Sequence, residues 1–298
     1  MENNLHVEIV SRENIKPSSP TPPNLKTFNL SLFDQRAPPV YTTLVLFYQI
    51  STDAINNNII ITTLKKSLSE ALTSYVPLAG KIDNINNSNI VECTDQGAIF
   101  IEAKSKTILS TFLEENPNED LLLERLLPAK TRSAEAATSP LLLVQATLFE
   151  CGGLAIGLCM SHKLADAATL CMFLKNWSNP AQRFTLTVPK EFDISPESIW
   201  FPLPRDQRNN NNNNNIESLM IKTVNKSWCN FGFYEVNFGW GKPIWAWRPS
   251  SSNENVLKLM DTKNGGVEVS LTLSKENMAL FERDPHILAF ANPSHPFI

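Results

Sequence analysis

Apolar residues along the chain follow two periods, one typical of β-strands and one typical of α-helices. Alternating or continuous β-branched and aromatic residues predict strands over 5–10, 41–50, 89–92, 98–103, 141–149, 154–160, 231–241, 256–260 and 267–273. Apolar residues three and four positions apart predict helices over 59–75, 167–177 and 275–283. Because both kinds of element alternate along one chain, we expect an α/β fold.

Turn and capping residues set the expected ends of these elements. The first long helix is expected to begin at Thr62 or Thr63 as N-cap and to stop before Pro77. Residues 95–97 (Asp-Gln-Gly) are expected to turn a hairpin formed by the two short strands that flank them. Ser274 is the expected N-cap of the last helix.

Two features interrupt the pattern of apolar residues after position 180. Five prolines between residues 180 and 208 predict an extended linker. A run of seven asparagines, Asn209–Asn215, follows directly. Such a run cannot bury apolar area, so it predicts a disordered bridge between two parts of the chain.

Composition and charge narrow the class of protein. At 298 residues, 42% hydrophobic and 19% charged, the chain is typical of a globular protein with one large domain or two ordinary ones. Twenty-six basic against thirty acidic residues give a formal net charge of −4, which argues against a nucleic-acid partner. The absence of GxGxxG and GxxxxGK[ST] patterns removes support for dinucleotide and P-loop sites.

Cysteine usage and the length of apolar runs indicate a cytoplasmic protein. The five cysteines are scattered without a CxxC pair, so we expect no disulfide framework and no metal site. The first residues lack the basic and apolar regions of a signal peptide. The most apolar stretch, 141–160, is interrupted by Gln145, Glu150 and two glycines, so no membrane span is expected.

Histidine is the usual general base near neutral pH, and the chain has four: His6, His162, His286 and His295. His162 is the strongest candidate because it follows the most apolar strand pair and directly precedes an amphipathic helix. Turns from strand to helix are where α/β sheets place functional side chains. The other three lie near the chain ends or in an expected turn.

Asp166 lies four residues after His162 and forms an HxxxD pattern with it. At the start of a helix, Asp166 can cap backbone N–H groups and hold the preceding loop. From the residues alone, it stays open that Asp166 is only an N-cap and His162 only a loop residue. Cys159 is not expected to be a nucleophile, because strand alternation directs its thiol to the face opposite Met160. We interpret it as a buried apolar residue.

Longer stretches around these residues resemble the BAHD family of plant acyl-CoA-dependent acyltransferases. The matching segments, in order, are LSEALTSYVPLAGKI (68–82), MSHKLADAATLCMFLKNW (160–177), SWCNFGFYEVNFGWGKPIW (227–245) and the stretch 256–291. HxxxD together with FGWGKP makes the resemblance specific, and it covers nearly the whole chain. The branch that looks most similar is the vinorine synthase-like group, which acetylates alkaloids and related alcohols.

The resemblance implies a two-domain CoA-dependent acyltransferase fold with mixed sheets flanked by helices. Its parts would be an N-terminal domain over 1–200 with HxxxD, a linker over 201–215 and a shortened second domain over 216–298. The second domain would carry the structural signature Asn237, Phe238, Gly239, Trp240 and Gly241. Members of the family are usually monomers, so the resemblance implies a monomer.

The resemblance also implies a mechanism. His162 would take the proton from a hydroxyl or amine of the acceptor, a plant secondary metabolite, which then attacks the thioester of acyl-CoA. The same imidazole would protonate the departing thiolate, and Asp166 would shape the site. Acyl-CoA, expected to be acetyl-CoA, would be a co-substrate and not a bound cofactor.

Three departures from the family pattern lead to a rival hypothesis. Asn237 stands where the family has aspartate, so an ion pair with arginine would become an ordinary hydrogen bond. His162 and Asn237 are only 75 positions apart, an interval in which family members carry most of a second domain. The arginine that pairs with the family's HxxxD aspartate belongs to that interval. The rival is therefore a catalytically inactive, truncated pseudoenzyme.

Two further groups of residues have both a functional and a structural interpretation. Three tryptophans lie close together: Trp240, Trp245 and Trp247. They could form a stacking platform for a ligand, but positions in the hydrophobic core are the favoured interpretation. Four basic residues follow the asparagine run: Lys222, Lys226, Lys242 and Arg248. They could contact the phosphates of CoA, but scattered surface charge is the favoured interpretation.

Overall fold

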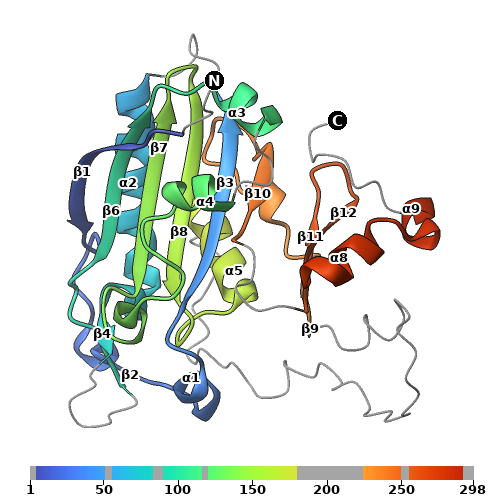
Figure 1. Ribbon diagram of the computed structural model, residues 1–298. Coiled ribbons are helices and arrows are strands. Elements are labelled where there is room, and N and C mark those ends of the chain that lie inside the picture. Colours follow the sequence, from blue (N-terminus) through green and yellow to red (C-terminus); the bar gives the residue numbers. More distant parts are fainter. Residues whose placement is uncertain are drawn as a thin grey trace.

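The computed structural model describes residues 5–50, 56–82, 90–115, 120–179, 224–249 and 255–290. Its largest element is a six-stranded sheet with the order β1-β6-β7-β8-β3-β10 (Figure 1). These strands are β1 (Glu8–Ile15), β6 (Ala98–Ser105), β7 (Leu142–Phe149), β8 (Gly153–Ser161), β3 (Tyr41–Gln49) and β10 (Trp245–Trp247). β6 and β7 run parallel, and the other neighbouring strands run antiparallel.

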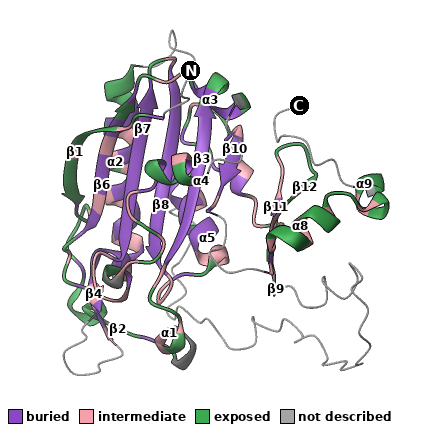
Figure 2. Cartoon of the chain, in the orientation of Figure 1, coloured by how far each residue is buried: buried purple, intermediate pink, exposed green. Residues whose placement is uncertain are grey.

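Helices cover both faces of this sheet, which explains why its central strands are mostly apolar and buried. One hydrophobic core lies between the sheet and the helices α2 (Asn57–Ser74) and α5 (Ala167–Ser178). A second core lies on the other face, under α3 (Leu109–Glu115) and α4 (Asp120–Leu123). Every residue of β7 and β8 is buried, as Figure 2 shows for the middle of the sheet.

Two three-stranded sheets accompany the large one. The first contains β2 (Thr27–Asn29), β5 (Ile90–Glu92) and β4 (Lys81–Ile82), and the second contains β12 (Val267–Thr272), β11 (Val256–Asp261) and β9 (Val224–Trp228). The remaining helices are α1 (Leu32–Arg36), α8 (Lys275–Phe281) and α9 (Pro285–Phe290). In Figure 1 the second small sheet lies with α8 and α9 on the β10 side of the large sheet.

Most elements predicted from periodicity are confirmed. The long strands over 41–50, 141–149 and 154–160 are β3, β7 and β8, and the helix over 167–177 is α5. The C-terminal strands and helix are also present, and the Ser274 side chain caps α8 by accepting from the Asn277 N–H at 3.3 Å. The α/β class follows from this arrangement.

The hairpin predicted around residues 95–97 is wrong. β5 pairs with β2 and β4, whereas β6 pairs with β1 and β7, so the two strands belong to different sheets. The reason is a long-range anchor at Asp95. Its carboxylate accepts hydrogen bonds from the Thr21 backbone N–H at 3.1 Å and from the Lys26 ammonium at 3.0 Å. These contacts fix the connection to the N-terminal segment and prevent a tight turn.

Three other sequence predictions need correction at element ends. α2 is capped by Asn56, whose Oδ1 accepts from the Asn58 N–H at 2.8 Å, so Thr62 and Thr63 lie inside the helix. The first strand spans 8–15 where the sequence predicted 5–10. His286 lies in α9 where a turn was expected.

The strand predicted over 231–241 is absent. The backbone takes positive φ at Asn230 (65°) and Gly232 (74°), and a short 3-10 turn, Phe233–Glu235, follows. The extended strand comes later, as β10, and it pairs with β3 at the edge of the large sheet. A segment predicted to belong to the unit over 216–298 therefore completes the N-terminal sheet. The predicted linker and the asparagine run lie outside the described residues, so the domain boundary stays a prediction.

Candidate active site

The loop that carries His162 is fixed at both ends by backbone hydrogen bonds. β8 ends at Ser161, and the His162 N–H donates to the carbonyl of Val40 at 2.9 Å, next to the start of β3. The Ala165 N–H then donates to the Ser161 carbonyl at 3.0 Å, and the Thr42 hydroxyl donates to the Ala165 carbonyl at 2.9 Å. The turn from strand to helix is thus held by the end of β8 and by the start of the neighbouring strand β3.

Asp166 ends this loop and begins α5. Its Oδ1 accepts a hydrogen bond from the Thr169 N–H at 2.8 Å, which identifies it as the N-cap of the helix. A carboxylate at this position also interacts favourably with the positive end of the helix dipole. The side chain is exposed, and within the described residues it has no ion-pair partner. Among the described residues, Asp166 therefore holds the loop by capping its own helix.

His162 is partly buried, and its imidazole has no hydrogen-bond partner among the described residues. The side chain is therefore tied to no other group in this part of the chain. An imidazole in this state has one nitrogen available to accept a proton and is suited to general-base chemistry. The structure places His162 and Asp166 on one short loop, as the HxxxD pattern predicts.

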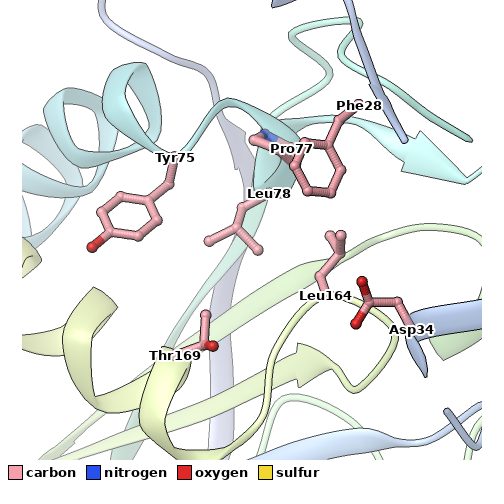
Figure 3. Close-up of a pocket in the computed structure, with 7 residues that line it drawn as sticks. All are labelled: Phe28, Asp34, Tyr75, Pro77, Leu78, Leu164 and Thr169. Atoms are coloured by element: carbon pink, nitrogen blue, oxygen red, sulfur yellow. The ribbon is translucent and has the colours of Figure 1, made fainter. Parts of the chain in front are cut away.

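A cavity lies beside the same loop (Figure 3). Its lining is mainly apolar and comes from four parts of the chain: Phe28, Asp34, Tyr75, Pro77, Leu78, Leu164 and Thr169. Leu164 belongs to the HxxxD loop, and Thr169 is the residue whose N–H Asp166 caps. The Asp34 carboxylate is already engaged by the Ser31 hydroxyl at 2.8 Å. His162 does not line this cavity, and Leu164 is the residue of its loop that does.

Cys159 is buried, as predicted, with 0% of its surface exposed. Its thiol belongs to the core on the α3 side, whereas Met160 belongs to the core on the α2 side. Burial raises the pKa of this thiol to about 12. A thiol with so high a pKa carries almost no thiolate near neutral pH and is a poor nucleophile.

The predicted signature at 237–241 forms a compact loop organised by its first residue. The Asn237 Oδ1 accepts hydrogen bonds from the Gly239 N–H at 2.8 Å and the Gly241 N–H at 3.1 Å. Both glycines have φ of 111°, a conformation that disfavours any residue with a side chain. Trp240 stacks on Phe238 with ring centroids 5.5 Å apart. Asn237 therefore works as a local backbone acceptor and not as half of an ion pair.

The tryptophans of this region belong to the hydrophobic cores, as predicted. Trp245 and Trp247 are buried, and Trp245 stacks on Phe47 of β3 with centroids 5.2 Å apart. Trp240 is partly buried and packs against the core on the α2 side.

The basic candidates separate into two groups. Lys242 is exposed and forms an ion pair with Glu235 at 2.6 Å, which fits the surface interpretation. Arg248 does not fit it, because its guanidinium lies over the Trp228 ring at 3.9 Å and burial lowers its pKa to about 10. Sequence reasoning missed Lys258, a buried lysine of β11. The signal was a single lysine within the apolar strand VLKLM. Lys222 lies outside the described residues.

The described residues contain neither a candidate membrane span nor a candidate metal site. No helix there combines the length and the apolar character needed to cross a membrane. No group of three or more His, Cys, Asp or Glu side chains is arranged to hold a metal ion in the same residues.

Comparison with known proteins identifies the class of protein. The family model described as "Transferase family" matches residues 5–223 and 206–288, on both sides of the asparagine run. The chain therefore belongs to this family, the BAHD acyltransferases, and is an acyltransferase by descent.

Relatives of known name are plant acetyltransferases. A limonoid 21-O-acetyltransferase of Melia azedarach is 29% identical over 426 aligned positions that cover 97% of this chain and 99% of the relative. A salutaridinol 7-O-acetyltransferase of Papaver somniferum is 41% identical over 179 residues, which cover 58% of this chain and 36% of the relative. A stemmadenine O-acetyltransferase of Catharanthus roseus is 40% identical over 192 residues, which cover 63% of this chain and 45% of the relative.

The lengths of these matches show that the chain is shorter than its relatives. The first alignment is longer than the 298 residues of the chain, so part of the Melia relative has no counterpart here. In the other two matches, the aligned region spans less than half of the relative. These lengths agree with the short interval between His162 and Asn237.

Solved structures show the same fold. Vinorine synthase superposes with a TM-score of 0.78 at 24% identity, covering 98% of this chain and 100% of that one. The TRI101 protein of F. sporotrichioides, in complex with coenzyme A and T-2, superposes with a TM-score of 0.62 at 14% identity. The match covers 89% of this chain and 99% of that one. The predicted CoA-dependent acyltransferase fold is confirmed.

Proposed function

We propose that this chain transfers an acetyl group from acetyl-CoA to a hydroxyl group of a plant secondary metabolite, with His162 as general base. The observation that carries the proposal is the partly buried His162 imidazole, which has no hydrogen-bond partner among the described residues and lies on a loop fixed between β8 and α5. The family supports acyl transfer, and the relatives, named as acetyltransferases acting on limonoids and alkaloids, support the acyl group and the acceptor class.

The proposed reaction is a direct transfer. The imidazole takes the proton of the acceptor hydroxyl, and the oxygen attacks the thioester carbonyl, so that a C–O bond forms while the C–S bond breaks. The imidazolium then gives its proton to the departing CoA thiolate. No enzyme nucleophile is required, which agrees with the burial of Cys159. Asp166 is a positioning residue, because it holds the loop by capping α5.

The test is release of free thiol. Purified full-length protein is incubated with acetyl-CoA and a panel of alkaloid and limonoid alcohols. We expect thiol release with at least one acceptor, and loss of at least about 100-fold in His162→Ala, the usual size of a general-base contribution. His286→Ala is the matched control, because His286 lies far along the chain in α9. Equal rates in wild type and His162→Ala would overturn the assignment of the base.

The rival hypothesis is an inactive pseudoenzyme, and the part of the Melia relative that has no counterpart here favours it. The two hypotheses differ in one result. Absence of thiol release with every acceptor, from a protein that unfolds cooperatively, would support the pseudoenzyme. Sequencing the transcript across Arg205–Glu217 is a second test, because a longer reading frame would show that the chain is an incomplete product.

We further propose a cytoplasmic monomer with a first domain over 1–200 and a second over 216–298. The scattered cysteines and the family's habit support this assignment. Size-exclusion chromatography with light scattering checks it, because a mass of twice 33.4 kDa would contradict the monomer. A fluorescent fusion of the full chain in plant cells checks the compartment.

A further inference from the structure

The loop that carries His162 is tied at two points to one short segment of the chain, residues 35–40. At one end of this segment, the Val40 carbonyl accepts a hydrogen bond from the His162 N–H at 2.9 Å. At the other end, the Gln35 carbonyl accepts one from the Lys163 ammonium at 3.0 Å. We call these two hydrogen bonds the loop clamp, because two neighbouring loop residues hold both ends of the same segment.

The segment between the two anchor carbonyls is rigid. The Ala37 N–H donates back into α1 at 3.1 Å. Pro38 and Pro39 follow, and each proline ring fixes one backbone dihedral. The Val40 N–H then donates to the Pro38 carbonyl at 2.8 Å. The two anchor carbonyls are therefore held at a set separation, independently of the loop that binds them.

The bond from Lys163 uses an acceptor that α1 cannot satisfy by itself. The last carbonyls of a helix have no partner within the helix, and lysine side chains can bind them. Gln35 supplies one of these carbonyls, since α1 ends at Arg36. A hydrogen bond with a charged donor is about twice as strong as a neutral one. Among the described residues, no ion pair competes for the Lys163 ammonium.

The direction of the His162 imidazole depends on this clamp. The imidazole has no hydrogen-bond partner among the described residues, so the backbone that carries it must set where it points. A single hydrogen bond at the His162 N–H lets the loop turn about that bond, and a second bond one residue later removes this rotation. Asp34 of α1 and Leu164 of the loop also line the same cavity (Figure 3), so the clamp joins two of its walls.

We propose that Lys163 is a positioning residue for acyl transfer, because it locks the His162 loop onto α1 through the Gln35 carbonyl. The effect on catalysis rests on the proposed function, whereas the clamp itself does not. A general base acts only within hydrogen-bond reach of the proton that it takes, and a small displacement of a catalytic group costs a large factor in rate. Asp166 fixes the far end of the loop, and Lys163 fixes the end next to the base.

Steady-state kinetics of acetyl transfer test the positioning role. Lys163→Met keeps most of the length of the side chain and removes the donor. We expect kcat to fall at least about tenfold, because the base is no longer held in one direction. The KM values for acetyl-CoA and the acceptor should stay within about threefold, because no substrate contact is removed. An unchanged kcat, or a change confined to KM, would overturn the positioning role.

Two further variants separate positioning from a general loss of structure. Lys163→Arg keeps a charged donor and should recover at least about half of the wild-type kcat. Lys66→Met is the matched control, an exposed lysine of α2, and should react as wild type does. A Lys163→Arg variant as slow as Lys163→Met would contradict the role of the donor.

Hydrogen exchange of the full-length protein tests the clamp without any catalysis. We expect the peptide over residues 159–166, which contains the His162 N–H, to exchange at least about tenfold faster in Lys163→Met than in wild type, because local opening becomes more frequent. Lys66→Met should exchange as wild type does. Mass spectrometry of the digested protein measures all three. Equal exchange in wild type and Lys163→Met would overturn the clamp.

A third measurement needs no variant. Arg36 is exposed directly beside the clamp, where trypsin can reach it. We expect the Arg36–Ala37 bond of the folded wild-type protein to resist trypsin until the protein unfolds, because a segment tied at both ends cannot enter the protease. Rapid cleavage of this bond under native conditions would contradict the clamp even if Lys163→Met failed to fold.

The clamp and the proposed function can fail independently. Absence of thiol release from the wild-type protein would overturn the proposed function and with it the role of Lys163 in catalysis, whereas hydrogen exchange would still decide whether the clamp exists. Thiol release with the same kcat in wild type and Lys163→Met would overturn the positioning role and leave the proposed function standing.

Discussion

At the scale of single residues, hydrogen-bond geometry decides what a substitution means. Asn237 replaces an aspartate of the family pattern. The loss of the aspartate's negative charge was expected to turn an ion pair with an arginine into an ordinary hydrogen bond. The structure shows a local role instead, because its side-chain oxygen accepts from two backbone N–H groups of its own loop. The oxygen is the essential atom, and aspartate has the same oxygen.

Asn237→Asp is therefore expected to change the free energy of unfolding by less than about 0.5 kcal/mol, whereas Asn237→Ala should cost about 1 kcal/mol. The alanine leaves the Gly239 and Gly241 N–H groups to water. Urea unfolding measures both variants. A loss of similar size in Asn237→Asp would show that the neutral amide itself is required.

Lys258 makes stability depend on pH. Burial, with Arg248 and Lys226 nearby, lowers its pKa from 10.5 to about 8, and Asp120 opposes this only in part. Between about pH 8 and 10.5 the unfolded chain binds the proton that the folded protein has lost, so this group's cost falls as the pH rises. Below pH 8 the full cost, up to about 3 kcal/mol, is present.

Lys258→Met is thus expected to be more stable than wild type at pH 7 in phosphate-free buffer. The difference should shrink as the pH rises from 8 to 10.5. Urea midpoints of the two proteins across this range measure the effect. A difference that does not change with pH would show that burial does not lower the pKa of this lysine.

At the scale of elements, the turn from β8 to α5 shows how a capping residue can position a catalytic one. Asp166 was interpreted both as an N-cap and as a site residue, and the structure shows the cap directly. The loop between Ser161 and Ala167 is bonded to Val40 and to Thr42 of β3, and the cap by Asp166 adds a further anchor where the loop enters α5.

Asp166→Ala is expected to cost about 1 kcal/mol of stability and to lower the rate of thiol release, because the loop that carries His162 loosens. Asp166→Asn keeps an oxygen that can accept from Thr169 and should retain most of both properties. Thermal unfolding and initial rates are measured in parallel. Full stability of Asp166→Ala, or collapse of both properties in Asp166→Asn, would contradict the capping role.

At the scale of the whole molecule, the C-terminal part of the chain completes the N-terminal core. β10 closes the β3 edge of the large sheet, and Phe238 packs edge-on against Trp177 of α5 with centroids 4.8 Å apart. The polypeptide on the two sides of the asparagine run therefore forms one cooperative structure in this region. An open β3 edge would otherwise be a site for aggregation.

Phe238→Ala is accordingly expected to cost about 3 kcal/mol, the usual loss for a buried phenylalanine. The matched control is Leu288→Ala in α9, where the side chain is 46% exposed and the change should stay within about 0.5 kcal/mol. Chemical unfolding followed by tryptophan fluorescence measures both. A Phe238→Ala variant as stable as the control would show that the C-terminal segment is not integral to the core.

The pattern of apolar residues along the chain predicted an element well where the element is buried on both faces, or where its apolar residues recur with a clear period. β3, β7, β8 and α5 follow from runs of apolar residues that have no other stable arrangement. Prediction failed at residues 95–97 and 231–241. There the outcome depended on partners far along the chain, namely Thr21 for Asp95 and the β3 edge for β10. The candidate site was predictable to the extent that His162 and Asp166 lie on one short stretch.

The sequence by itself determined the family, the α/β class, the HxxxD loop and the burial of Cys159, because each depends on neighbours within a few positions or on the order of motifs. Only the tertiary structure decided that Asn237 bonds its own loop, that β10 joins the first sheet, that Arg248 packs on Trp228 and that Lys258 is buried in β11. The physical reason is that pairing across a sheet edge and the cost of a buried charge depend on residues distant in sequence. No local pattern records which of them will meet.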